Sequence, residues 1–133
     1  MNRVMVDMSA TLLHHGHVRL IKEAAKHGEV IVALTSDEEI IKHKGYAPEL
    51  DYESRKEIIS SIRHVSNVVP SNWLIDEGFL NVHKIDFLVH GSDNSNQISN
   101  DRLIILPRTL GISSSILRGR VLSSISQLYL SRD

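Results

Sequence analysis

Short, almost continuous apolar runs alternate along the chain with longer stretches in which apolar residues recur every three or four positions. Such short runs are typical of parallel strands covered on both faces, and the longer pattern is typical of amphipathic helices. The predicted strands are residues 3–8, 29–34, 65–69, 85–89 and 103–106. The predicted helices are residues 15–27, 37–41, 53–64, 73–83 and 112–130, with Gly119 as a candidate break in the last.

This alternation predicts an α/β fold: a Rossmann-like, open, mainly parallel five-stranded sheet with helices on both faces. No repeat or linker interrupts it, so we expect one domain over residues 1–133. Gly28 is expected to cap the first helix, Pro70 to end the third strand, and residues 42–48 to form an exposed loop. Ligands of such sheets bind at the carboxyl ends of the strands, where the strand order reverses.

The overall composition excludes several classes of protein. A formal net charge of −1 gives no electrostatic reason to expect a nucleic-acid partner. The absence of cysteine excludes disulfides, thiolate metal sites and a cysteine nucleophile. Because the sequence shows neither a signal peptide nor an apolar run of about 18 residues, we expect a soluble cytoplasmic protein without a membrane partner.

The junction between the first predicted strand and helix, His14-His15-Gly16-His17, is a candidate phosphate site. The first N–H groups of a helix have no partners within it, and the helix dipole adds roughly half a positive charge there. Gly16 lets the backbone approach a ligand, and His14 and His17 can aim their imidazoles at one point. Two alternatives stay open: the histidines cap or pack the helix start, or all three bind a metal such as zinc, although no carboxylate or thiolate accompanies them.

The segment from Arg108 to Ser115 contains an arginine, a glycine and three serines, which are poor residues for filling a core. They suit oxyanions, because arginine offers a phosphate two parallel hydrogen bonds and serines at a helix N-terminus offer hydroxyl and N–H donors. The loops after the first, second, fourth and fifth predicted strands hold the histidines, Lys42 with Lys44, residues 91–93, and Arg108 with Thr109. We expect these four loops to meet in one crevice.

Taken in order, these segments resemble the cytidylyltransferase family. The chain has His-x-Gly-His at 14–17, Lys-Gly at 44–45, Arg-Lys at 55–56, Ser-Ile-Arg at 61–63 and Arg-Thr-x-Gly-Ile-Ser at 108–113. The resemblance covers nearly the whole chain and is strongest to the bacterial glycerol-3-phosphate branch. It implies transfer of CMP from CTP to a small phosphorylated acceptor, with release of pyrophosphate. It further implies Mg²⁺ bound mainly through the triphosphate, and a homodimer.

The resemblance also implies roles for individual residues. The catalytic group is His14, His17, Lys44 and Arg108, which would stabilise charge on the pentavalent transition state and on the leaving pyrophosphate. Further nucleotide contacts fall on Ser9, Ala10, Gly16, Arg63, Gly91, Asp93, Thr109, Ile112, Ser113 and Ser114, and acceptor contacts on Thr11, Lys44, Arg55 and Trp73. Without the resemblance, Lys44 is surface charge, Arg55 and Arg63 are polar helix positions, and Trp73 is a core residue.

The chain departs from the family at several positions. Thr11 replaces an aspartate and cannot carry its charge, Ser66 and Leu110 replace acidic residues, and Asn94 replaces a tryptophan. These changes leave the acceptor open among glycerol 3-phosphate, phosphocholine, phosphoethanolamine and a phosphonate. Two other functions also stay open. One is an adenylyltransferase that uses ATP, because such enzymes share His-x-Gly-His, and the other is a non-catalytic nucleotide-binding module, which Thr11 favours.

Overall fold

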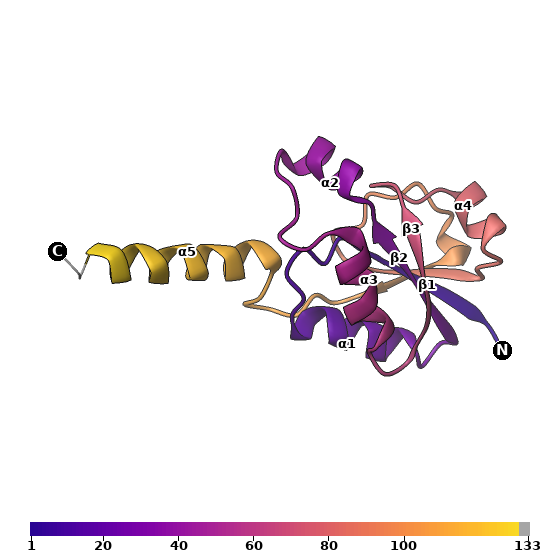
Figure 1. Ribbon diagram of the computed structural model, residues 1–133. Helices are drawn as coiled ribbons and strands as arrows, with labels where there is room; N and C mark the ends of the chain where they lie inside the picture. Colours follow the sequence, from indigo (N-terminus) through magenta and orange to yellow (C-terminus); the bar gives the residue numbers. More distant parts are fainter. Residues whose placement is uncertain (131–133) are drawn as a thin grey trace.

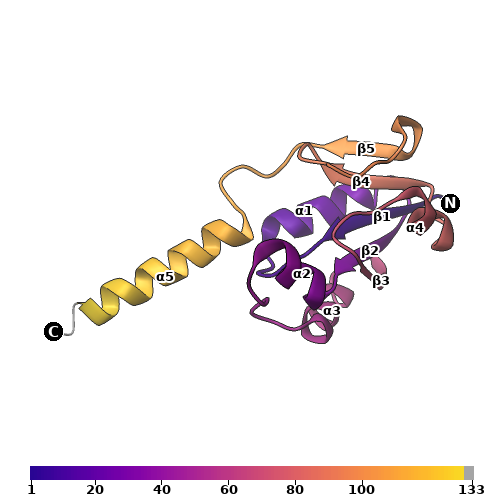
Figure 2. The ribbon, with the colours of Figure 1, turned by 90° about the horizontal axis from the view of Figure 1, so that it is seen from above.

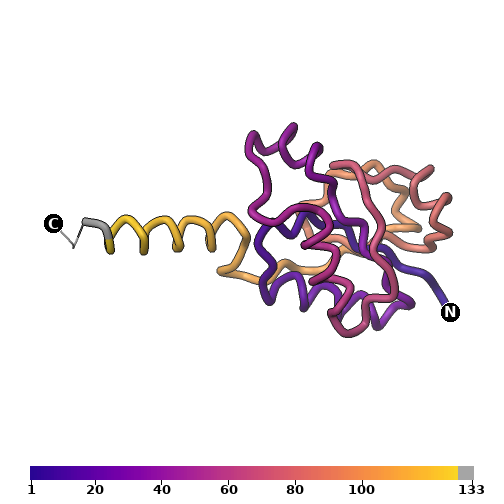
Figure 3. The backbone as a smooth tube through the Cα atoms, in the orientation of Figure 1, coloured from indigo at the N-terminus to yellow at the C-terminus, as the bar shows by residue number. Residues whose placement is uncertain are grey.

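The computed structural model describes residues 1–130, which form a sheet flanked by helices, with a long helix at the end (Figures 1 and 3). The strands are β1 (Arg3–Met8), β2 (Glu29–Thr35), β3 (Val65–Ser71), β4 (Phe87–Gly91) and β5 (Leu103–Leu106). They lie in the order β3-β2-β1-β4-β5, and every neighbouring pair is parallel. This five-stranded parallel sheet confirms the predicted fold class.

Helices cover both faces of the sheet. They are α1 (His15–Ala24), α2 (Asp37–Lys44), α3 (Tyr52–Ser60), α4 (Glu77–Val82) and α5 (Ser114–Leu130), and a short 3₁₀ turn, η1 (Asn100–Arg102), precedes β5. One core cluster packs Ile21 of α1 and Ile59 of α3 against Val6 of β1. A second cluster packs Leu80 of α4 against Met5 on the opposite face. α5 extends away from this body (Figure 2).

The order of the strands determines where a ligand can enter. The chain runs outward from β1 through β2 to β3, then returns to pair β4 with the other side of β1. The order therefore reverses between β1 and β4, and the connections diverge there at the carboxyl ends of the strands. The central strands carry fully buried residues such as Val4, Val32 and Leu88, each 0% exposed, which explains their continuous apolar runs.

Several predicted element ends are wrong. α1 ends at Ala24, and Gly28 does not cap it. A side chain at Gly28 would collide with the carbonyl oxygen of Asn2, so this glycine serves a close backbone contact. Pro70 does not end β3, because β3 is an edge strand, where a proline is tolerated. α5 passes through Gly119 without a break.

The ends nearest to the site also differ from the prediction. Residues 42–44 are not a loop, because α2 continues to Lys44 and Gly45 ends it with a left-handed φ of 79°. Basic side chains in that last turn also interact favourably with the helix dipole. α3 spans Tyr52–Ser60 rather than 53–64. Residues 73–75 are not helical, because α4 begins only after Asp76, whose side chain caps it.

Within residues 1–130, no helix is both long and apolar enough to cross a bilayer.

Candidate active site

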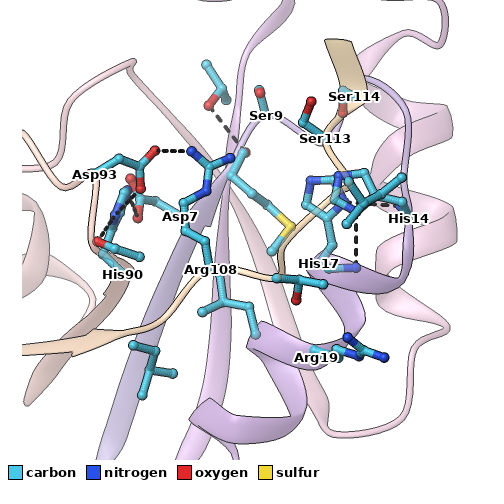
Figure 4. A pocket seen from close by; sticks show the side chains of 18 of the residues that line it. Asp7, Ser9, His14, His17, Arg19, His90, Asp93, Arg108, Ser113 and Ser114 are labelled. Atoms are coloured by element: carbon cyan, nitrogen blue, oxygen red, sulfur yellow. Dashed lines mark hydrogen bonds and ion pairs between the residues drawn. The ribbon is translucent and has the colours of Figure 1, made fainter. Parts of the chain in front are cut away.

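A cavity of about 550 Å³ opens at the carboxyl ends of the strands, where β1 and β4 meet (Figure 4). Its walls come from the ends of β1 and β4, the start of α1, the end of α2, the loop after β3 and the segment between β5 and α5. Its volume is typical of a small-ligand site. The predicted site residues that line it are Ser9, His14, Gly16, His17, Lys44, Trp73, Gly91, Asp93, Arg108, Thr109, Ile112, Ser113 and Ser114.

His14 and His17 form a reciprocal cap at the start of α1. The Nδ1 of His14, the N-cap residue, accepts a hydrogen bond from the backbone N–H of Gly16 at 3.0 Å. The Nδ1 of His17 accepts one from the backbone N–H of His14 at 3.1 Å. This is the arrangement of a capping box, built here from two histidines, and it holds the ring centroids 4.0 Å apart.

These hydrogen bonds determine the proton state of both rings. A nitrogen that accepts a hydrogen bond carries no proton, so each neutral ring carries its proton on Nε2. Burial, together with His14 and Lys44, lowers the pKa of His17 to about 3. Burial, His15 and Arg108 lower the pKa of His14. Both rings are therefore neutral at pH 7 and offer Nε2–H donors at the cavity.

Gly16 is needed for this cap. A Cβ at this position would lie 2.8 Å from Cε1 and 2.9 Å from Nδ1 of His14, which is closer than such atoms normally approach. The glycine therefore gives room to the His14 ring. The sequence predicts that the backbone approaches a ligand at Gly16, but the His14 ring accepts the hydrogen bond from the N–H of Gly16. The donors at this end of the cavity are imidazole groups instead.

The N-terminus of α5 lies beside the histidines (Figure 4). The Oγ of Ser113 accepts a hydrogen bond from the backbone N–H of Ile116 at 3.1 Å and so caps the helix. The Oγ of Ser114 donates to the carbonyl of Leu12 at 2.9 Å and accepts from the N–H of Leu12 at 3.3 Å. These bonds fix the helix start next to the loop after β1. The dipole of this 17-residue helix makes its N-terminal end attractive to anions.

Arg108 approaches the cavity from the loop after β5 and pairs with Asp93. Its Nη1 lies 3.1 Å from Oδ2 of Asp93, and both side chains are 54% exposed. A Cβ on Gly91 would lie 2.9 Å from Oδ1 of Asp93 and 3.1 Å from Cγ of Arg108, so this glycine makes room for the pair. An exposed pair contributes little to stability. Arg108 can therefore exchange the carboxylate for a phosphate at small cost.

Lys44 and Trp73 line the cavity on the side of β2 and β3. The ring of His43 stacks on Trp73 with centroids 4.9 Å apart and an interplanar angle of 14°. The Nζ of Lys44 lies 5.9 Å from the Trp73 ring centroid, within the range of a cation–π contact. The backbone N–H of Trp73 donates to Oε1 of Glu39 at 2.9 Å, which ties the loop after β3 to α2. This side thus offers one cation beside a flat apolar surface.

Two ionisable residues at the cavity, Asp7 and His90, were missed in the sequence. The Nε2 of His90 lies 3.4 Å from Oδ1 of Asp7, and its Nδ1 donates to the carbonyl of Gly91 at 3.1 Å. The other oxygen of Asp7, Oδ2, accepts from Nδ2 of Asn96 at 3.3 Å. Burial alone would lower the pKa of His90, but Asp7, the Gly91 carbonyl and Asp93 raise it. The sequence contains a feature that could have identified them, because each of the two residues follows an apolar run that leads to the switch point.

Arg55 does not line the cavity, contrary to the expected acceptor contact. Its side chain is buried, and its Nη1 donates to the carbonyl oxygens of Ser9 at 2.7 Å and Thr35 at 3.0 Å. Its Nη2 donates to Oδ1 of Asp37 at 2.6 Å, and its Nε to the carbonyl of Leu50 at 3.1 Å. The guanidinium thus joins the ends of β1 and β2 to α2. It supports the cavity from behind.

Three other predicted contacts lie outside the cavity. Thr11 is 0% exposed, and its hydroxyl accepts a hydrogen bond from Nη2 of Arg118 in α5 at 3.2 Å. Arg118 pairs with the carboxylate of Glu49, so no charge at position 11 is needed to balance it. Ala10 is buried behind the loop with a φ of 46°. Arg63 precedes β3 and therefore lies at the amino ends of the strands, at the opposite edge of the sheet from the cavity.

The chain is similar to known cytidylyltransferases over most of its length. A family model described as Cytidylyltransferase-like matches residues 11–120. The glycerol-3-phosphate cytidylyltransferase of Bacillus subtilis is 31% identical, over 91% of this chain and 98% of its own length. The enzyme of the same name from Staphylococcus aureus is 37% identical, over 89% of this chain and 93% of its own length. The ethanolamine-phosphate cytidylyltransferase of Mus musculus is 33% identical over 90% of this chain, but that match spans 32% of the mouse protein.

A solved structure shares the fold. The lipopolysaccharide core biosynthesis protein from Thermoplasma volcanium GSS1 has a TM-score of 0.69 to this chain, with coverage of 82% of this chain and 98% of that one. At 22% identity, this likeness concerns the fold alone. The family match is more informative, because residues 11–120 include the loops that follow β2, β3, β4 and β5 as well as the start of α1. By this match, the chain belongs to the cytidylyltransferase-like family.

Proposed function

We propose that this chain transfers CMP from CTP to a small phosphorylated acceptor, forming a CDP-linked product and releasing pyrophosphate. The main support is the convergence of donors on one cavity: the Nε2–H groups of His14 and His17, the N-terminus of α5 and the guanidinium of Arg108. Such groups suit a chain of phosphates. The named relatives act on glycerol 3-phosphate and ethanolamine phosphate, which have a phosphate monoester in common.

The reaction is an in-line displacement at the α-phosphorus of CTP. An anionic oxygen of the acceptor phosphate forms the new P–O bond, the bond from the α-phosphorus to the bridging oxygen breaks, and pyrophosphate leaves with the electron pair. The nucleophile is already ionised near pH 7, so no general base is required. Neutral His14 and His17 would donate Nε2–H hydrogen bonds to oxygens whose charge increases in the transition state. Catalysis then consists of positioning and charge stabilisation.

The remaining residues divide between the two sides of the sheet. Arg108 and the start of α5 follow β5, on one side of the switch point. We assign them to the β- and γ-phosphates, because a forked guanidinium and a helix N-terminus suit the leaving pyrophosphate. Lys44 and Trp73 follow β2 and β3, on the other side, and we assign them to the acceptor.

Mg²⁺ is part of the proposal, because it would neutralise part of the triphosphate charge. Within residues 1–130, no group of three or more histidine or acidic side chains could hold a metal ion. The proposed ion would be held mainly by phosphate oxygens and water, as is usual for Mg²⁺. A homodimer in the cytoplasm completes the proposal, on the strength of the family resemblance and the composition.

Pyrophosphate release tests the proposal. CTP and ATP are each combined with Mg²⁺ and with glycerol 3-phosphate, phosphocholine, phosphoethanolamine or a phosphonate. We expect turnover with CTP that requires one of these acceptors. Faster turnover with ATP would identify an adenylyltransferase. CTP binding without turnover on any acceptor would indicate a nucleotide-binding module and contradict the proposed activity.

A further inference from the structure

Asp7 and His90 occupy matching positions on the two strands that border the switch point. Val6 of β1 pairs with Val89 of β4, so the next residue on each strand, Asp7 or His90, is directed to the same face of the sheet. Both residues line the cavity. Neither has a role in the reaction proposed above. Both side chains can carry a charge close to where an anionic substrate would bind.

The surroundings of His90 favour its protonated form on geometry alone. Its Nδ1 lies 3.1 Å from the carbonyl oxygen of Gly91 and 3.7 Å from Oδ1 of Asp93. Its Nε2 lies 3.4 Å from Oδ1 of Asp7. Carbonyl and carboxylate oxygens only accept hydrogen bonds, and a neutral imidazole has one N–H to offer. Only the imidazolium, which has an N–H on each ring nitrogen, can donate to the acceptors on both sides of the ring.

The other ionisable groups around His90 do not reverse this preference. Asp7 faces it from β1 and Asp93 from the loop after β4. Arg108, from the loop after β5, is paired with Asp93 and so offsets part of that carboxylate. Asn96 contributes a neutral amide, which binds Asp7. The pKa of His90 is accordingly raised above its ordinary value by Asp7, the Gly91 carbonyl and Asp93, although burial alone would lower it.

The carboxylate of Asp7 requires a nearby positive charge to compensate its burial. Its Oδ2 accepts from Asn96, but its Oδ1 is buried and has no hydrogen-bond partner among the described residues. A buried carboxylate without compensation is costly. It would also repel a triphosphate, because charges in a partly enclosed cavity are weakly screened.

We propose that protonated His90 is a positioning residue for CTP, which acts by neutralising Asp7 so that the cavity accepts the triphosphate. This role rests on the proposed function, because CTP is the anion concerned. When His90 loses its proton, Asp7 becomes an uncompensated negative charge at the switch point. CTP affinity then falls on the alkaline side of the His90 titration.

Four proteins separate this role from a structural one: the wild type, His90→Gln, Asp7→Asn and the Asp7→Asn/His90→Gln double variant. CTP affinity is measured by calorimetry with Mg²⁺ at about pH 6.5, the ordinary pKa of histidine, and at about pH 8.5, well to the alkaline side of that value. His27→Gln is the matched control, because His27 is exposed and outside the cavity. Thermal unfolding checks that each variant is folded.

We expect wild-type affinity to fall about tenfold from the lower to the higher pH, and His90→Gln to bind about tenfold more weakly than wild type at the lower pH. Asp7→Asn should bind at least as tightly as wild type and lose less affinity at the higher pH. The double variant should regain most of the affinity that His90→Gln loses. A purely structural pair would give no such recovery. His90→Gln with wild-type affinity, or a double variant no better than His90→Gln, overturns the proposal.

A titration of the His90 imidazole by NMR, without ligand, needs only the wild type. The proposal requires a midpoint above about 6.5, the ordinary value for histidine, and a lower midpoint in Asp7→Asn. A wild-type midpoint at or below that value overturns it, whether or not the variants fold. If the wild type binds no CTP at either pH, the proposed function fails and the role of His90 fails with it. If the wild type and His90→Gln bind CTP with equal affinity, only this inference is overturned.

Discussion

The two ends of the cavity surround the same side chain with opposite kinds of hydrogen-bond partner. At the start of α1, His14 and His17 face backbone N–H groups, which only donate, so their Nδ1 atoms must accept and the rings stay neutral. At the ends of β1 and β4, His90 faces a carbonyl and a carboxylate, which only accept, so its ring favours the imidazolium. The partner groups, and not the residue type, determine the charge of each histidine.

This difference suits the two ends of the cavity to different roles. Neutral rings can donate to phosphate oxygens without the desolvation cost of a buried charge. A charged ring can compensate a carboxylate, which a neutral ring cannot do. In the proposed roles, one cavity would hold neutral donors for a developing charge and a cation that balances a permanent one.

Removing an imidazole donor should have the largest effect. His17→Ala or His14→Ala should lower kcat by about 10²–10³-fold, the range found when one such donor is removed. Loss of the cap should also cost about 1 kcal/mol of unfolding free energy. Initial rates with CTP and the best acceptor, together with thermal unfolding, measure both. His15→Ala is the control, because His15 is exposed and does not line the cavity. Near-wild-type turnover of both cap variants would show that the imidazoles are not catalytic.

Displacing the same ring without removing it should have a smaller effect. In Gly16→Ala the new methyl group would lie 2.8 Å from Cε1 of His14, so the ring must move. A displaced donor should lower kcat by about tenfold to 10²-fold, since small errors in position are costly. Gly119→Ala is the matched control, because a Cβ there meets nothing within 4 Å and alanine favours a helix. Equal activity of the two variants would argue against the need for room at Gly16.

The smallest effect should appear in stability against pH, with opposite signs at the two ends. The pKa of His17 is lowered to about 3 in the folded chain. Its stabilising contribution is therefore complete above the unfolded value of about 6.5 and falls as the pH drops toward 3. The raised pKa of His90 works the other way, so its contribution is present below about 6.5 and is lost as the pH rises through its folded pKa.

Thermal unfolding across pH checks these signs. His17→Asn should flatten the acid side of the Tm profile, and His90→Asn should flatten the alkaline side. The exposed His27 again supplies the control substitution. If both variants reproduce the wild-type Tm profile, the pKa values of His17 and His90 are not shifted in the folded chain as the hydrogen bonds indicate.

The sheet could be predicted from the sequence because buried parallel strands are almost wholly apolar. The run from Val30 to Leu34 is one case, since every residue in it is nearly or fully buried. Helix ends were harder, because they depend on tertiary contacts. Residues 73–75 have a helical pattern but lie in a loop held by Glu39, and the helix starts only at the Asp76 cap.

The meeting of four loops could also be predicted, because parallel strands share a carboxyl edge. The roles of single side chains could not be predicted from the sequence. The family resemblance implies an acceptor contact for Arg55, yet its guanidinium is buried among backbone carbonyls brought together by the fold. The role of His90 could not be predicted, because the significance of one histidine after an apolar run depends on Asp7, which is 83 residues away along the chain.

The proton states of the imidazoles in the presence of CTP test the central comparison most directly. Long-range ¹H–¹⁵N NMR should show His14 and His17 at pH 7 as neutral rings protonated on Nε2, and His90 becoming the imidazolium at a higher pH than either of them. Added CTP should shift these signals but not those of His27. Doubly protonated His14 and His17, or signals that CTP leaves unchanged, would contradict the account.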